Sequence, residues 1–169
     1  MKLDLQLIDV TDEEVLSQAS SLNFSDNRSY LEPSPIISHL LTLTSFPSHR
    51  YVEWWCSSMT SYSVEDFATG IRYALSPHVD KDEREYFESG EIVLPLAGGV
   101  FYYFDGPVEG GELELEDQII APVSGRLVVF DVTKLHAVRE VKSGVRNAIT
   151  FNLWDHKICT APAYSDPSV

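Results

Sequence analysis

The chain has 169 residues, of which 44% are hydrophobic, and this size and composition are ordinary for one globular domain with its own core. Its formal net charge is −14, and its 12 basic residues are scattered, so the sequence argues against the positive surface that nucleic-acid binding requires. The sequence has no apolar run of about 18 residues, so we expect no membrane span. It has only two cysteines, Cys56 and Cys159, which do not make a disulfide framework. Because the acidic N-terminus also lacks a signal-peptide pattern, we expect a cytoplasmic protein.

The first 50 residues predict two short helices joined by a loop. Thr11 is followed three positions later by Glu14, which is the pattern of a capping box, so we expect a helix over residues 12–22. Residues 23–35 are rich in Ser, Asn, Asp and Pro and predict a loop, after which residues 36–43 suit a second helix. We expect both helices to pack on one sheet of the domain that follows.

From Tyr51 onward the chain consists of short β-branched and aromatic segments separated by Gly and Pro. Many short strands with tight turns are typical of an all-β sandwich or jelly roll. The expected strands are 51–58, 68–75, 91–96, 99–104, 111–115, 118–121, 126–132, 135–141 and 145–154. We therefore predict a single, mainly β domain over 1–169, with helical N-terminal support in 1–50 and a jelly-roll core in 51–155.

The segment "SPHVDKDE", residues 76–83, places a histidine and an aspartate two positions apart. On an extended segment, His78 and Asp80 point to the same side. A neutral imidazole and a carboxylate on one side can be two of the three ligands of a non-haem iron. They can equally be a surface pair that closes a loop, so the metal interpretation needs a third ligand elsewhere in the chain.

A candidate third ligand and a candidate anion clamp lie in the final segment, "LHAVREVKSGVRNAITFNLW". His136 lies in one expected strand, and Arg146 begins the next. If residues 142–144 form a three-residue hairpin loop with Gly144 in the left-handed conformation, the two side chains share a face. They would then leave a gap suited to a five-carbon diacid. A two-residue turn would place them on opposite faces, and each residue alone is also compatible with a structural role.

Four pieces of the sequence, in order, resemble the Fe(II)/2-oxoglutarate-dependent dioxygenases, and in particular their prolyl 4-hydroxylase branch. The pieces are "PHVD", "VFYYFDGPVEGGELEL", "PVSGRLVVFD" and "VRNAITFNLW". The resemblance implies a double-stranded β-helix (jelly roll) with N-terminal helices on one sheet. It also implies an enzyme that uses Fe(II), 2-oxoglutarate and dioxygen to hydroxylate an unactivated C–H bond. By analogy the substrate is a prolyl residue of a peptide or protein, or a free amino acid such as proline.

The resemblance also implies roles for individual residues. The residues that match the metal ligands are His78, Asp80 and His136, and the residue that matches the clamp for the far carboxylate of 2-oxoglutarate is Arg146. Such a set of two imidazoles and one carboxylate leaves iron positions open for co-substrate and oxygen. The guanidinium suits a carboxylate because its fork can bind both oxygens.

Three further residues are expected at the co-substrate. Tyr103 matches the tyrosine that hydrogen-bonds the same carboxylate, although a one-residue slip would replace it by Tyr102. Thr150 and Asn152 share the side of Arg146 by parity and are expected nearer the iron. Asn152 departs from the aromatic or basic residue that often occupies this position in the hydroxylases, which puts the substrate in doubt.

Two other functions stay open at the level of sequence. One is a cupin-type metalloprotein that runs a different reaction on the same scaffold, and the other is a non-catalytic jelly-roll binding module. The concentration of acidic residues in 80–91 and 109–117 also has two interpretations. It can serve solubility, or it can form an acidic rim near His78 that attracts a cationic substrate. The oligomeric state is not readable from the sequence.

Overall fold

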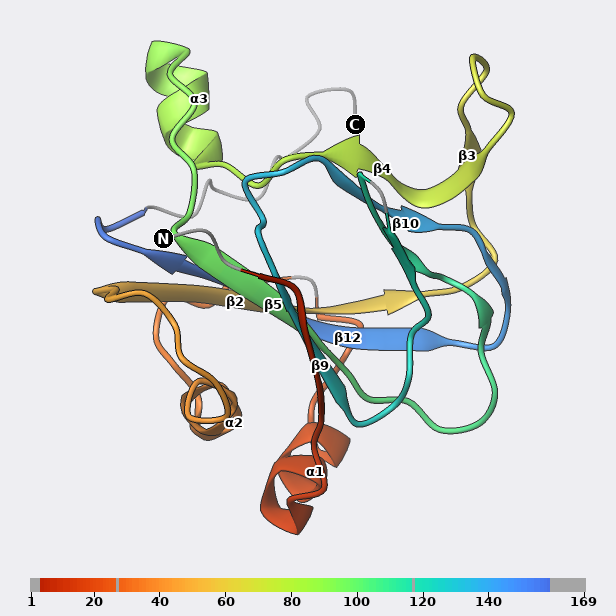
Figure 1. Cartoon of the computed structure of the whole chain (residues 1–169), viewed down its shortest axis with the longest axis horizontal. Coiled ribbons are helices and arrows are strands. Elements are labelled where there is room, and N and C mark those ends of the chain that lie inside the picture. The colour runs from red at the N-terminus through yellow and green to blue at the C-terminus, as the bar shows by residue number, and fades with distance from the viewer. Residues whose placement is uncertain (1–3, 27, 117, 159–169) are drawn as a thin grey trace.

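The computed structural model describes residues 4–26, 28–116 and 118–158. Two five-stranded antiparallel sheets form the body of the molecule, as Figure 1 shows. The helices are α1 (Glu13–Ser20), α2 (Pro35–Leu40) and α3 (Glu83–Ser89). The strands are β1 (Gln6–Asp9), β2 (Tyr51–Met59), β3 (Val64–Glu65), β4 (Arg72–His78), β5 (Ala97–Tyr102), β6 (Glu109–Gly110), β7 (Leu113–Leu115), β8 (Gln118–Ile120), β9 (Arg126–Phe130), β10 (His136–Arg139), β11 (Val141–Ser143) and β12 (Arg146–Trp154).

The strand order confirms the predicted jelly roll. One sheet has the order β1-β9-β5-β12-β2 and the other β3-β4-β10-β7-β8, while β11 and β6 form a small third pair. Except for the pairs β3-β4 and β7-β8, the neighbours within the two five-stranded sheets are not consecutive in the chain, so the chain crosses repeatedly between the two layers. Strand β12 lies between β5 and β2, which makes it an interior strand of the first sheet.

Helices α1 and α2 cover the outer face of the first sheet, as predicted for the N-terminal support (Figure 1). The alternation along β2 explains this contact: Val52, Trp54 and Cys56 are buried in one core cluster with residues of both helices. The N-cap of α1 is Asp12, whose carboxylate accepts from the backbone N–H groups of Glu14 and Val15. The predicted cap at Thr11 is therefore wrong by one residue.

The predicted hairpin between the last two strands is wrong. Strands β10 and β12 belong to different sheets, and Arg146 pairs with Met59 of β2 instead of Glu140. Gly144 does adopt the expected left-handed conformation, with φ +82°, but it lies where the chain passes between the sheets. A Cβ atom on Gly144 would lie 2.3 Å from the carbonyl oxygen of Pro107, so this crossing needs glycine.

Around His78 and Asp80, the strands and helices differ from those that the sequence predicted. The strand expected over 68–75 begins at Arg72 and continues to His78, which places this histidine at a strand end. Residues 91–96, expected as a strand, lie outside any strand, and helix α3 precedes them. Strand β1, which pairs with β9, was also missed.

Two features bear on the predictions about cysteines and membrane spans. Cys56 is a buried free thiol, and Cys159 lies outside the described residues. Within 4–26, 28–116 and 118–158, no helix is long and apolar enough to cross a membrane.

The interior position of β12 can be tested with two isoleucines. Ile149 on β12 is fully buried, whereas Ile119 on β8 is 54% exposed. Because the Ile149→Ala variant leaves a cavity in the core, we expect it to lower the free energy of unfolding by about 2–5 kcal/mol. The Ile119→Ala control should change it by less than about 0.5 kcal/mol. Urea denaturation measures both, and equal losses would contradict this description of the core.

Candidate active site

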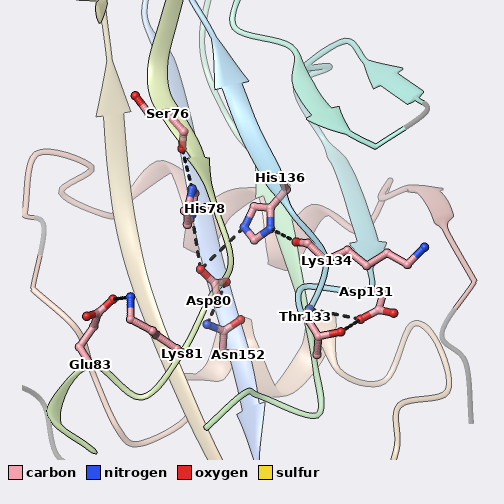
Figure 2. A network of polar contacts seen from close by, with 10 residues as sticks. All are labelled: Ser76, His78, Asp80, Lys81, Glu83, Asp131, Thr133, Lys134, His136 and Asn152. Carbon is pink, nitrogen blue, oxygen red and sulfur yellow. Dashed lines mark hydrogen bonds and ion pairs between the residues drawn. The ribbon is translucent and has the colours of Figure 1, made fainter. Parts of the chain in front are cut away.

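Three potential metal ligands meet where β4 and β10 lie side by side. His78 ends β4, His136 begins β10 directly opposite, and Asp80 follows β4 by two residues. The Oδ1 atom of Asp80 lies 3.5 Å from Nε2 of His78 and 3.7 Å from Nε2 of His136. All three candidate ligand atoms lie within 4.8 Å of one another, so one ion could contact all of them (Figure 2).

The remaining ring nitrogens of both histidines are fixed by backbone carbonyls. Nδ1 of His78 lies 2.9 Å from the carbonyl oxygen of Ser76, and Nδ1 of His136 lies 2.8 Å from that of Lys134 (Figure 2). A carbonyl oxygen only accepts hydrogen bonds, so each Nδ1 carries the proton and each Nε2 keeps a free lone pair. This is the usual outer support of metal-binding histidines, and the donor set therefore fits a divalent iron ion.

A buried asparagine fixes the carboxylate. Nδ2 of Asn152 donates to Oδ2 of Asp80 at 3.1 Å, which leaves Oδ1 to face the two imidazoles (Figure 2). Asn152 is only 2% exposed, and a Cβ atom on its neighbour Gly98 would lie 2.6 Å from the amide oxygen. The sequence suggested a place for Asn152 at the co-substrate, and the structure gives it a contact with Asp80.

Burial and mutual contacts shift the pKa values of the three residues in different directions. Burial acts to raise the pKa of Asp80, but the hydrogen bond with His78 and the neighbouring His136 hold that pKa below its usual value. Burial lowers the pKa of His136, while the contact with Asp80 raises the pKa of His78. At neutral pH the site therefore holds an ionised carboxylate beside a neutral His136.

An inner cavity of about 70 Å³ lies between the two sheets and links this cluster to Arg146. Its lining also contains Thr150, as the parity of the strand predicts. The apolar part of the wall is supplied by Leu75, Val100, Leu113, Phe130 and Val138. A ligand in this cavity would thus be shielded from water on most sides.

Arg146 is buried, being 2% exposed, and its guanidinium is held by uncharged groups. Nε donates to the carbonyl oxygen of Gly111 at 2.9 Å, and Nη2 donates to the hydroxyl of Tyr102 at 3.3 Å. Nη1 contacts the sulfur of Met59 at 3.7 Å. Among the described residues no carboxylate forms an ion pair with Arg146, and a buried charge without a partner is costly. The cavity is therefore suited to an anionic ligand.

The structure selects Tyr102 and not Tyr103 as the tyrosine beside this arginine. The guanidinium carbon also lies 4.8 Å from the centre of the Tyr102 ring. Tyr103 lies on the other side, stacked on Phe24 at 6.4 Å and packed against the helix-covered core. The expected contact of Tyr103 with the co-substrate carboxylate is thus not what the structure shows, because successive side chains of a strand face opposite ways.

Gly111 also contributes to the site, although the sequence predicted it only as the first residue of a strand. Its φ is +72°, and an added Cβ atom would lie 2.8 Å from Cδ of Arg146. The absence of a side chain therefore lets the arginine approach the backbone closely. The signal was present in the pair of glycines in "VEGGELEL", but nothing local connects it with Arg146, which lies 35 residues away.

The comparisons with known proteins agree with this geometry. The model of the 2OG-Fe(II) oxygenase superfamily matches residues 60–154, more than half of the chain. The chain belongs to this superfamily. It is an enzyme, a 2-oxoglutarate-dependent dioxygenase, and its cofactor and co-substrates are Fe(II), 2-oxoglutarate and dioxygen. No curated protein matches the sequence.

Several solved structures share the fold of this oxygenase at low sequence identity. A 2OG-Fe(II) oxygenase family oxidoreductase from Burkholderia pseudomallei has a TM-score of 0.55 and 13% identity, over 92% of this chain and 86% of that one. The viral collagen prolyl hydroxylase of Paramecium Bursaria Chlorella virus-1 has 0.55 and 16%, over 90% of each chain. HygX from Streptomyces hygroscopicus, solved with iron bound, has 0.52 and 16%, over 88% and 80%.

The contact between Asn152 and Asp80 predicts an effect on metal affinity. Because an Asn152→Leu variant leaves the carboxylate free to turn, we expect its dissociation constant for Mn(II) to rise about 10–100-fold. The matched control is Asn147→Leu, at an odd spacing on the same strand, which should leave the constant unchanged. Isothermal titration calorimetry gives the affinities, and thermal melts of the metal-free proteins check folding. Equal affinities for Asn152→Leu and the parent would contradict the assigned contact.

Proposed function

We propose that His78, Asp80 and His136 hold the Fe(II) of this dioxygenase and that Arg146 binds the far carboxylate of 2-oxoglutarate. The observation that carries this proposal is the buried guanidinium without an anionic partner, which shares one cavity with the three ligand atoms. A five-carbon diacid bound to metal at one end would bring its second carboxylate to that charge. The family match and this arginine favour the dioxygenase over a cupin of different chemistry or a non-catalytic module.

Each group of the site then has a defined task. When bound, the iron supplies the oxidation of a C–H bond by dioxygen, coupled to the decarboxylation of 2-oxoglutarate to succinate and CO₂. The overall balance gives one oxygen atom to the substrate as a hydroxyl and the other to succinate. His78 and His136 present neutral imidazole nitrogens, because their Nδ1 protons are held by backbone carbonyls. The apolar wall around Phe130 excludes water from the reacting groups.

The favoured substrate is a prolyl residue or a free amino acid such as proline. Support comes from the fold, which is similar to that of the viral collagen prolyl hydroxylase and of a Pseudomonas putida prolyl-4-hydroxylase. The latter has a TM-score of 0.51 and 15% identity, over 90% of this chain and 93% of that one. Fold analogy alone gives only the class of substrate, since one fold hosts many reactions.

We also propose that the enzyme works in the cytoplasm. The support is its small number of cysteines, since only Cys56 and Cys159 occur in the chain. A reducing compartment suits such a composition and preserves Fe(II).

An anaerobic titration tests the metal and co-substrate together. Adding Fe(II) and 2-oxoglutarate to the purified protein should produce the weak visible charge-transfer absorption of a 2-oxoglutarate chelate. Because His136→Ala removes one ligand, this variant should lose the band while circular dichroism shows that it is folded. Folded parent protein without a band would refute the proposed function.

Variants of Tyr102 and Tyr103 test which of the two tyrosines supports Arg146 in binding 2-oxoglutarate. Tyr102→Phe removes the hydroxyl that accepts the hydrogen bond from Nη2 of Arg146. We expect the dissociation constant of 2-oxoglutarate to rise about 2–10-fold. Tyr103→Phe, the matched control on the opposite face, should leave it unchanged. A larger effect from Tyr103→Phe would show that the other tyrosine assists the co-substrate.

A further inference from the structure

A second and larger hollow lies beside the candidate metal ligands. This outer cavity has a volume of about 310 Å³ and is lined by Ser29, Glu53, Trp55, Lys81, Glu83 and Asn152, together with the H-x-D segment. The inner and outer cavities share Trp55, His78 and Asp80. A molecule in the outer cavity therefore lies beside two of the three candidate metal ligands, His78 and Asp80, which also line the inner cavity. This position suits the substrate that is oxidised.

Strand β2 gives the combined cavity opposite charges at its two ends. Glu53, Trp55 and Met59 lie at even spacing on β2 and face the second sheet, because Val52, Trp54 and Cys56 face the helices. Met59 contacts the guanidinium of Arg146 in the inner cavity. Glu53, six residues earlier on the strand, lines the outer cavity. This face of β2 therefore extends from the buried guanidinium of Arg146 to the carboxylate of Glu53.

The other charged groups of the outer cavity already have partners. Nζ of Lys81 lies 2.9 Å from Oε1 of Glu83 and 4.9 Å from the centre of the Tyr86 ring. The carboxylate of Asp80 is engaged by Asn152 and by the two histidines. Glu53 is partly buried, and within the described part of the chain it forms no ion pair with a basic side chain.

Two further observations describe the polar groups of this cavity. Burial raises the pKa of Glu53 to about 7, the hydrogen bond with Ser29 acts against the rise, and the nearby charge of Asp80 adds to it. Asn152 also lines the cavity, and its amide oxygen Oδ1 is buried and has no hydrogen-bond partner among the described residues. A ligand with N–H donors and a positive charge would compensate the carboxylate. The face of Trp55 offers such a group a favourable contact.

We propose that the outer cavity binds a positively charged nitrogen group of the substrate, an ammonium or a guanidinium, with Glu53 as its carboxylate partner and Trp55 as its wall. This inference rests on the proposed function and narrows its substrate class. Free proline and other amino compounds carry such a group, whereas a prolyl residue inside a peptide does not. The substrate is therefore a cationic amine or a guanidino compound, in preference to an internal prolyl residue.

Two pairs of probes test the preference directly. L-Prolinamide is cationic and N-acetyl-L-prolinamide is neutral, while N-acetyl-L-argininamide and N-acetyl-L-citrullinamide have side chains of nearly the same shape, the first cationic and the second neutral. Each is titrated into ¹⁵N-labelled protein loaded with Zn(II) and 2-oxoglutarate. The indole N–H signal of Trp55, assigned with a Trp55→Phe variant, reports binding. We expect at least one cationic probe to shift it saturably and its neutral partner to bind about tenfold more weakly or less.

Two carboxylate variants show whether Glu53 causes the preference. Glu53→Gln keeps the shape of the side chain and removes its charge, so it should abolish the difference within the pair. The control Glu65→Gln removes the same charge at an exposed site on β3 and should preserve the difference. The proposal is overturned if neither cationic probe shifts the Trp55 signal, if the members of each pair bind equally, or if Glu53→Gln retains the difference.

Succinate formation separates this inference from the function on which it rests. The iron-loaded parent protein is assayed for turnover of 2-oxoglutarate without an added substrate, a reaction that does not need Glu53. Turnover together with no charge preference would refute the cationic substrate alone. A charge preference without turnover and without the charge-transfer band would refute the dioxygenase assignment of these residues and leave a cation-binding cavity.

Discussion

The unpaired charge of Arg146 is the constraint on which the arrangement of the site depends. A guanidinium stays ionised in a protein, so its burial requires either neutral acceptors around it or an anion in contact with it. Here Gly111 and Tyr102 supply acceptors on the protein side, and the cavity leaves the rest to a ligand. The glycine turn, the buried tyrosine and the apolar cavity wall can all be understood as the surroundings that this one charge needs.

Strand β12 is central to the site because three side chains on one of its faces make different contacts there. Arg146, Thr150 and Asn152 are separated by even numbers of residues, so all three project toward the second sheet. The first is placed to hold an anion and the second lines the cavity. The third donates a hydrogen bond to the carboxylate of Asp80, which lies just after β4 of the other sheet. The hydrogen bond from Asn152 thus ties the two layers together at the metal ligands.

The inner and outer cavities differ in their charged side chains, although the protein as a whole is strongly acidic. Among the described residues, Arg146 is the one basic side chain of the inner cavity besides the histidines, whereas Glu53, Glu83 and Lys81 line the outer cavity. The buried charge of Arg146 would repel a cationic substrate from the inner cavity. This local charge matters for 2-oxoglutarate, because the overall charge of −14 favours the approach of cations and not of a dianion.

The sequence by itself predicted the jelly roll and the helical support, because alternation and turn residues are local properties. It predicted His78, Asp80, His136 and Arg146 as one group through the resemblance of four ordered segments to the dioxygenases. Only the tertiary structure decided which tyrosine faces the arginine, since parity is known only once strand ends are known. It also replaced the expected hairpin at Gly144 by a crossing between sheets. The contacts of Gly111, Asn152 and Glu53 depend on pairs far apart in the chain, and such long-range pairing leaves no trace in local periodicity.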